Sequence, residues 1–308
     1  MSVWLPTAPC TPESCLTDRD PVVAFPRRAL RLAACLTVLV TGIVLSLPVR
    51  AFPPAARDRL VRLWARTLLG SLGVAVRLSA PPAAGGGVLV VANHVSWLDI
   101  PLIAAGRPAR SLAKTEVGRW PVLGPLVAWG GTVFLDRDRL RSLPGTVAAV
   151  AEELRAGRSM VVFPEGSTWC GRESGRFRPA FFEAAVQAGA PVQPVTIRYR
   201  LADGRPTSTP AFVGEDGLLA SLARVVAVRG LVADVTFLPL LPPVAGPTRR
   251  AAQAAPGGPG GPGQPVEPGE SVEPGERVRP VNERWRARRE LARAAQTAVE
   301  AAGRGASP

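Results

Sequence analysis

The sequence predicts an α/β fold with a mixed, largely parallel sheet flanked by helices, preceded by an N-terminal membrane-associated helical segment. Short apolar runs alternate with helix-like stretches between residues 87 and 243, as expected where strands and helices alternate along a chain. An uncharged apolar stretch at residues 32–49 precedes them. Hydrophobic residues make up 47% of the 308-residue chain, so a large core can be buried.

The N-terminal part divides into a tail and a membrane segment. Residues 1–28 are rich in proline, threonine and charge without periodicity, which predicts a flexible tail. As a helix, residues 32–49 would extend roughly 27 Å, the lower end of what a bilayer core requires. A signal peptide and a buried core helix are the alternatives, but the segment starts late and no clean small-residue cleavage site follows. We assign residues 29–50 to the membrane.

Arginines flank this segment, and a slightly larger number follows it than precedes it. This excess predicts a catalytic domain on the cytoplasmic side of the cell membrane. Residues 57–70 carry apolar side chains at the spacing of one helix face. Such a helix either packs on the core or lies among lipid headgroups.

The central domain is expected at residues 51–243. Its predicted strands are 88–92, 132–135, 159–163, 192–197 and 233–238, and its clearest helices are 143–155 and 179–187. Residues 244–281 are rich in proline and glycine and repeat the sequence VEPGE, which predicts a linker. Residues 282–308 predict a basic helix and tail, which either contacts lipid or is solvated.

Charge and cysteine spacing limit the ligands. The formal net charge of +13 favours an anionic partner, and the absence of nucleic-acid-binding motifs favours a membrane surface or a phosphorylated substrate over nucleic acid. The four cysteines form no CxxC pair, which predicts reduced thiols. With a single histidine, a His-rich metal site is excluded, and we expect no metal site.

The single histidine, His94, lies in NHVSWLD, between a predicted strand and a predicted helix. On one continuous helix, His94 and Asp99 would lie roughly 140° apart, so they can meet only across a turn. A carboxylate beside an imidazole fixes its tautomer and raises its basicity, as a general base requires. Alternatively, Asp99 caps the helix that contains Pro101. Ser96 lies in no GxSxG nucleophile elbow.

Three further segments follow in order: GTVFLDR with Arg137, FPEGST with Glu165 and Gly166, and PVQPVTI at residues 191–197. Together with NHVSWLD, they resemble the four motif blocks of the glycerolipid acyltransferase family, which includes the 1-acylglycerol-3-phosphate acyltransferases. The resemblance covers about residues 85 to 240. Each of the second and fourth blocks is a weak pattern alone, whereas the ordered set of four is specific.

The resemblance implies a role for each matching residue. His94 is the implied general base, deprotonating an acceptor hydroxyl that attacks an acyl thioester directly, and Asp99 orients it. Arg137 is implied to bind the acceptor phosphate, with Glu165 and Gly166 near the same group. The residues alone leave alternatives: Arg137 could pair with a neighbouring aspartate, and Glu165 could serve only the turn.

Lys114 resembles a lysine often found between the first two blocks and is a candidate anion contact. Its segment AKTEVGRWPVLG, and the run WLDIP, also resemble relatives that acylate lyso-ornithine lipids. The third block has Ser167-Thr168 where many members have Thr-Arg, which removes one cation near the expected phosphate. Nearby apolar residues either line an acyl-chain groove or pack in the core: Trp120, Pro121, Leu123 and Trp129.

The resemblance implies a lysophospholipid acceptor, a membrane-lipid environment and no cofactor. Acyl-CoA or acyl-carrier protein would be the co-substrate. The first acceptor is 1-acyl-sn-glycerol 3-phosphate, and a lyso-ornithine or other lyso-amino-acid lipid is the alternative. A non-catalytic membrane scaffold of the same fold is a further alternative, and a thioesterase or lipase is disfavoured by the missing nucleophile elbow.

Overall fold

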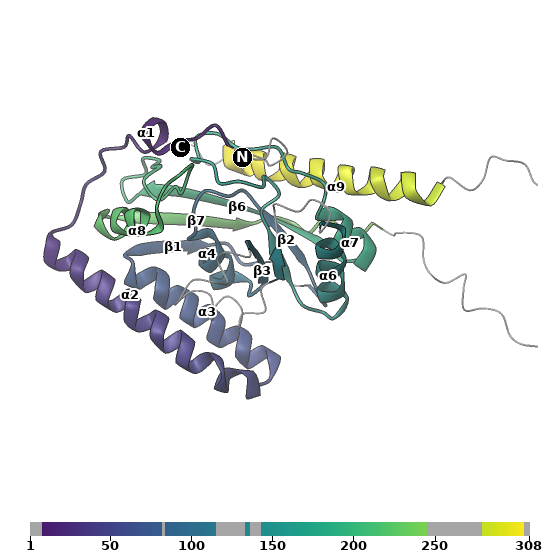
Figure 1. Ribbon diagram of the computed structural model, residues 1–308, viewed down its shortest axis with the longest axis horizontal. Helices are drawn as coiled ribbons and strands as arrows, with labels where there is room; N and C mark the ends of the chain where they lie inside the picture. The colour runs from purple at the N-terminus through teal and green to yellow at the C-terminus, as the bar shows by residue number, and fades with distance from the viewer. Residues whose placement is uncertain (1–7, 82–83, 115–132, 136–142, 245–278, 305–308) are drawn as a thin grey trace, which may run out of the picture.

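The computed structural model describes residues 8–81, 84–114, 133–135, 143–244 and 279–304. Its centre is a seven-stranded sheet with the order β1-β7-β6-β2-β5-β3-β4 (Figure 1). The strands are β1 (Val74–Leu78), β2 (Leu89–Ala92), β3 (Arg110–Lys114), β4 (Val133–Leu135), β5 (Met160–Val162), β6 (Val192–Leu201) and β7 (Leu231–Phe237).

Only one pairing in this sheet is antiparallel, that of β6 with β7. The pairs β1–β7, β6–β2, β2–β5, β5–β3 and β3–β4 are all parallel. The prediction of a mixed, largely parallel sheet is therefore confirmed. Because β6, β2, β5, β3 and β4 run in one direction, their carboxyl ends share one edge, which is where α/β sheets carry their sites.

Helices cover both faces of the sheet, so each face has its own apolar core. One core contains residues of α3 (Pro54–Ser71), α4 (Asp99–Gly106) and α8 (Leu218–Ala227), including Leu69, Leu102 and Val225. The other contains residues of α6 (Leu143–Arg155), α7 (Phe182–Ala188) and α9 (Arg279–Arg304). Parallel strands that are buried on both faces explain the unbroken apolar runs such as that of β2.

Helix α2 (Phe25–Ser46) and the short 3₁₀ turn η1 (Pro48–Ala51) lead into α3, and the two long helices lie side by side (Figure 1). The indole N–H of Trp64 in α3 donates to the carbonyl of Val38 in α2 at 3.0 Å. Helix α2 is the one described helix that is long and apolar enough to cross a membrane, and 6% of its apolar window is buried. It begins four residues before the predicted segment 29–50 and ends at Ser46, just before Pro48.

The N-terminal end of α2 is bound to the domain through Arg31. Its guanidinium donates to the carbonyls of Val226 and Val228, each at 2.8 Å, where α8 ends. Exposed apolar side chains occur along the whole of α2: Phe25, Leu30, Leu32, Leu36, Val40, Val44 and Leu45. A helix with this distribution packs by one side and leaves an apolar side uncovered.

The N-terminal segment differs from the predicted flexible tail over residues 8–24. It forms the short helix α1 (Pro12–Cys15), whose capping box is made by Thr11 and Ser14. Beyond it, the carboxylate of Asp18 accepts the N–H of Ser208 at 2.7 Å, and Val22 forms an isolated bridge with Val228. Polar side chains of this segment therefore bind another loop.

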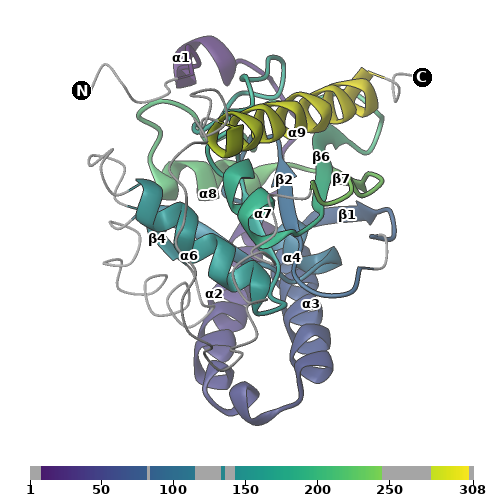
Figure 2. The ribbon, with the colours of Figure 1, turned by 90° about the vertical axis from the view of Figure 1, so that its right-hand side faces the viewer.

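Helix α9 lies across the sheet beside α7 (Figure 2). Its buried side chains are Ala287, Leu291, Ala292, Ala295 and Val299. The hydroxyl of Thr196 in β6 donates to the carbonyl of Val299 at 2.9 Å. The sequence left open whether this helix touches lipid or solvent, and the structure places its apolar stripe on the core.

Candidate active site

Three of the predicted site segments meet at the carboxyl edge of the sheet. His94 follows β2 after one residue, Glu165 lies three residues after β5, and Lys114 is the last residue of β3. Because these strands are adjacent and parallel, sequence segments far apart come together here.

The carboxylate of Asp99 is the centre of the turn between β2 and α4. It is fully buried, and its Oδ2 lies 2.8 Å from Nδ1 of His94. The same oxygen accepts the backbone N–H groups of Val95 at 2.7 Å and Ser96 at 2.9 Å. Asp99 therefore binds the turn that precedes it. It is the first residue of α4, and its side chain does not cap that helix.

The second oxygen of Asp99 accepts a hydrogen bond from the chain's only tyrosine. The phenol of Tyr199 donates to Oδ1 at 2.6 Å. Burial, and then the charge of Asp99, raise the pKa of Tyr199 well above its ordinary value, so the phenol stays neutral and donates. Val195 of β6 pairs with Ala92, the last residue of β2. Strand β6 then continues four residues further to Tyr199.

Tyr199 is not among the site residues predicted from the sequence, because it lies about a hundred residues after Asp99 and outside the fourth motif block. The signal that could have identified it is the position of the tyrosine in VTIRY, just after the apolar part of a strand. Such a side chain at the carboxyl end of a strand is aimed at the same edge as His94.

The imidazole of His94 is held by contacts on its side chain and on its backbone. Its ring stacks on Phe163, with centroids 3.9 Å apart and an interplanar angle of 13°. Its carbonyl accepts the N–H of Trp169 at 2.8 Å. The side chain is 19% exposed, so the ring reaches the surface of the site while its Nδ1 side is bound to Asp99.

Glu165 supports the main chain of His94. Its Oε2 accepts the N–H of His94 at 2.8 Å, and its Oε1 accepts the N–H of Gly175 at 3.0 Å. The residue is 3% exposed. The pKa of Glu165 is raised from 4.5 to about 7. Burial is the main cause and the charge of Asp99 adds to it, whereas the two backbone hydrogen bonds lower the pKa.

Asn93 fixes the end of β2 against β6. Its side-chain amide donates to the carbonyl of Ile197 at 2.9 Å and accepts the N–H of the same residue at 2.9 Å. The side-chain amide of Asn93 thus makes the two hydrogen bonds with β6 that a backbone amide would make if β2 were longer. It explains why the motif begins with asparagine and not with an apolar residue.

The other predicted residues differ in how far the structure describes them. Gly166 lies in the turn after β5 with a φ of +75°, a backbone conformation that favours glycine, and its N–H donates to the carbonyl of Phe163. Lys114 pairs through its backbone with Leu135 of β4. Arg137 lies outside the described residues, as do the four apolar residues considered for an acyl-chain groove: Trp120, Pro121, Leu123 and Trp129.

A histidine held by a buried aspartate at the carboxyl edge of an α/β sheet is an arrangement that can move a proton on and off a substrate hydroxyl. The family model described as Acyltransferase matches residues 74–198, a range that contains His94, Asp99 and Glu165 and ends one residue before Tyr199. The chain belongs to this family and is an acyltransferase.

Two named relatives show the range of the family. A 1-acyl-sn-glycerol-3-phosphate acyltransferase of Neisseria meningitidis serogroup B is 38% identical over 186 residues, covering 60% of this chain and 72% of that protein. A lyso-ornithine lipid O-acyltransferase of Pseudomonas aeruginosa is 38% identical over 211 residues, covering 65% of this chain and 79% of that protein.

The fold is similar to a solved structure. The crystal structure of the 1-acyl-sn-glycerophosphate acyltransferase PlsC from Thermotoga maritima superimposes with a TM-score of 0.53 and 19% sequence identity. The match covers 73% of this chain and 90% of that one. The similarity supports the sheet and its flanking helices as a family architecture.

The raised pKa of Glu165 predicts that stability falls as the pH rises. Below about pH 4.5 the side chain is neutral both folded and unfolded, whereas between about 4.5 and 7 the folded chain holds a proton that the unfolded chain releases. The free energy of unfolding should therefore decrease across this interval by roughly 3 kcal/mol, which corresponds to the pKa difference. Chemical denaturation of the purified protein at several pH values measures it.

Two variants make this prediction specific. Glu165→Gln removes the titrating group, so this part of the pH dependence should disappear, although stability falls at every pH because an amide offers one acceptor to two N–H donors. Glu152→Gln is the control, because the Glu152 side chain is 74% exposed and should leave the slope unchanged. An unaltered slope in Glu165→Gln would contradict the assignment.

Proposed function

We propose that this acyltransferase moves a fatty acyl group from an acyl thioester to the hydroxyl of a lysophospholipid, with 1-acyl-sn-glycerol 3-phosphate as the first acceptor and phosphatidate as the product. The observation that carries the proposal is the hydrogen bond of 2.8 Å between His94 and Asp99 within the NHVSWLD turn. The relative from Neisseria meningitidis supports the choice of acceptor.

In this mechanism His94 is the general base. Asp99 accepts from Nδ1, so the proton of a neutral imidazole resides there and Nε2 is left to receive the proton of the acceptor hydroxyl. The imidazolium that forms is stabilised by the buried carboxylate. Tyr199 donates to the other oxygen of Asp99 and thereby holds the carboxylate plane toward the ring.

The acyl transfer then needs no covalent intermediate on the enzyme. The acceptor oxygen forms a bond to the thioester carbonyl carbon as His94 takes its proton, giving a tetrahedral intermediate. Collapse of that intermediate breaks the carbon–sulfur bond, and the departing thiolate takes the proton back from His94. Acyl-CoA or acyl-carrier protein would supply the thioester, and no cofactor takes part.

The acceptor phosphate would lie near the ends of β3 and β4. Lys114 ends β3, and Arg137 follows β4 by two residues. Cationic side chains at this edge suit an anionic headgroup, and a guanidinium binds phosphate in a bidentate manner. Glu165 and Gly166 would shape the same region through the turn after β5. The side chain of Glu165 would do so indirectly, because it already accepts two backbone N–H groups.

Membrane attachment would place the site at the source of its acceptor. The uncovered apolar side of α2 supports insertion of that helix into lipid. The arginines that flank the segment favour a catalytic domain on the cytoplasmic side. A lysophospholipid would then reach His94 from the adjacent leaflet.

The first test is His94→Ala. The change removes the only imidazole of the chain, so the rate of acyl transfer should fall by at least about a hundredfold. The assay uses isolated membranes, a labelled acyl thioester and lysophosphatidate, with Glu152→Gln as a distant control of equal expression. Retained activity in His94→Ala would exclude the mechanism, because no second histidine can replace the first.

The second test is Tyr199→Phe, which keeps the aromatic ring and removes only the hydroxyl. A hydrogen bond to a charged group contributes roughly 1.5–3 kcal/mol, so kcat should fall about tenfold or more. KM for the acceptor should change little, because Tyr199 lies behind Asp99 and acts through it as a positioning residue. A normal kcat in a normally folded variant would remove Tyr199 from the mechanism.

The third test separates two acceptors. The lyso-ornithine lipid O-acyltransferase of Pseudomonas aeruginosa and the absence of an arginine at Thr168 favour a lyso-ornithine lipid as the second candidate. Purified protein in vesicles is given one labelled acyl-CoA with lysophosphatidate or with lyso-ornithine lipid. We expect labelled phosphatidate. Labelled ornithine lipid alone would establish the second candidate, and no transfer to either acceptor would contradict both.

A further inference from the structure

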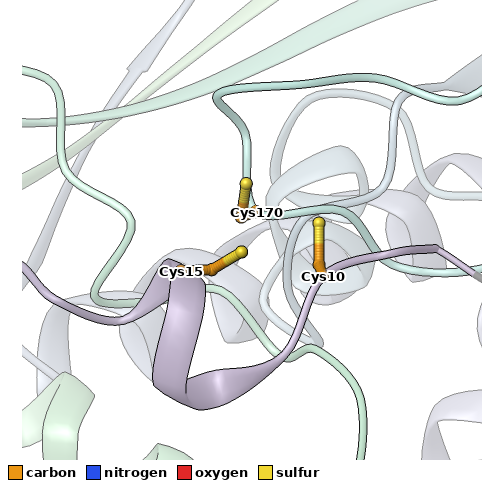
Figure 3. A group of neighbouring side chains, drawn as sticks. All are labelled: Cys10, Cys15 and Cys170. Carbon is orange, nitrogen blue, oxygen red and sulfur yellow. The ribbon is translucent and has the colours of Figure 1, made fainter.

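Three of the four cysteines lie together outside the catalytic turn. Cys10, Cys15 and Cys170 are 5%, 9% and 4% exposed, and their sulfurs all lie within 4.8 Å of one another. Figure 3 shows the three side chains gathered between the N-terminal segment and the loop that carries Cys170. All three are free thiols. Cys170 comes from a segment about 155 residues further along the chain, so the fold and not the local sequence brings them together.

The backbone around the cluster is fixed by other contacts. The N–H of Cys15 donates to the carbonyl of Thr11 at 3.0 Å, and its own carbonyl accepts the hydroxyl of Ser208 at 2.5 Å. Arg172, two residues after Cys170, donates to Asp18 at 2.6 Å. The N-terminal segment and the Cys170 loop are therefore held against each other by groups other than the sulfurs. Ligands held in this way are preorganised for binding.

The spacing of the sulfurs fits a single metal ion. With metal–sulfur bonds of about 2.3 Å, a tetrahedral ion holds its sulfurs about 3.8 Å apart, within the limit of 4.8 Å observed here. A [4Fe–4S] cluster binds each thiolate to a different iron and needs a wider separation, and a [2Fe–2S] cluster takes four cysteine ligands where this group has three. A disulfide would use two of the cysteines and leave the third buried without a function.

We propose that Cys10, Cys15 and Cys170 form a binding site for one thiophilic metal ion, with zinc as the ion to be tested. Thiolates are the ligands that select zinc and copper(I) over magnesium or calcium. On binding, the three thiols release their protons to solvent, and a fourth ligand completes the tetrahedron of a zinc ion.

The site would brace the loop that supports the catalytic histidine. Cys170 directly follows Trp169, whose N–H donates to the carbonyl of His94 at 2.8 Å. The same loop returns to Gly175, whose N–H binds Glu165. An ion held by Cys170 on one side and by Cys10 and Cys15 on the other would tie this loop to the N-terminal segment. Its role is structural, and it lies outside the proposed acyl-transfer chemistry.

The experiment is metal analysis of the full-length protein, purified in detergent from cells grown with zinc. We expect about one zinc ion per chain in the wild type and its loss in Cys10→Ser, Cys15→Ser and Cys170→Ser. Cys35→Ser is the matched control, because Cys35 is also buried but lies in α2, away from the cluster, and should keep the ion. Cobalt(II) in place of zinc should give thiolate charge-transfer absorption that these three variants lack.

A second measurement needs no variant. Removing the ion from the wild type with a strong chelator should lower its thermal unfolding temperature, and adding zinc should restore it. Wild-type protein that holds no zinc as isolated, and binds neither zinc nor copper(I) when incubated with them under reducing conditions, would overturn the proposal. A disulfide between two of the three cysteines would also overturn it. Loss of acyl transfer in His94→Ala bears only on the proposed function, because that variant should still hold the ion.

Discussion

The buried carboxylate of Asp99 is the constraint on which the arrangement of the candidate active site depends. Removing an ionised carboxylate from water costs several kcal/mol, and only hydrogen bonds can offset that cost. Here the offset comes from His94, from two backbone N–H groups and from the phenol of Tyr199. Because these donors belong to the turn and to β6, satisfying Asp99 also fixes the path from β2 to α4 and the position of the ring.

Glu165 is the counterpart of Asp99 on the other side of His94. Asp99 binds the imidazole, whereas Glu165 binds the backbone N–H of the same residue. Two buried carboxylates close together disfavour simultaneous ionisation, and the charge of Asp99 contributes to the raised pKa of Glu165. Because its pKa is raised to about 7, Glu165 is a carboxyl group that takes up a proton near neutral pH. The histidine is thus bound through its ring by Asp99 and through its main chain by Glu165.

Periodicity predicted most of the sheet and the longer helices. The apolar runs of β2, β5, β6 and β7 and the helix α6 were identifiable, because strands buried on both faces and an amphipathic helix leave clear patterns. Strand β3, RSLAK, was not, because a segment with so few apolar residues has no such pattern. The same limit applies to residues 8–24, in which Asp18 and Asp20 bind residues far along the chain and no periodic face forms.

The site itself was predictable only in part, and the reason is sequence separation. The contact between His94 and Asp99 follows from five residues of spacing and a turn, whereas the contact between Asp99 and Tyr199 depends on how far β6 extends past β2. The cysteine cluster depends on the same kind of long-range placement. Spacing rules detect metal ligands that are close in sequence. Four residues separate Cys10 from Cys15, so they form no CxxC pair, and the third member of the cluster, Cys170, lies far along the chain.

Long-range contacts also connect helix α2 to the body of the domain that carries His94. From the cysteine cluster the chain runs past Asp18, which binds the loop at Ser208, and then to Arg31 in α2, which binds the carbonyls at the end of α8. The residues between the cluster and α2 are thus bound to the body of the domain at several points. A helix attached in this way cannot move freely relative to His94. The distance between α2 and the imidazole of His94 is therefore set by the fold, which is what the proposed acyl transfer needs if α2 is inserted and the acceptor is presented at a fixed depth in the leaflet.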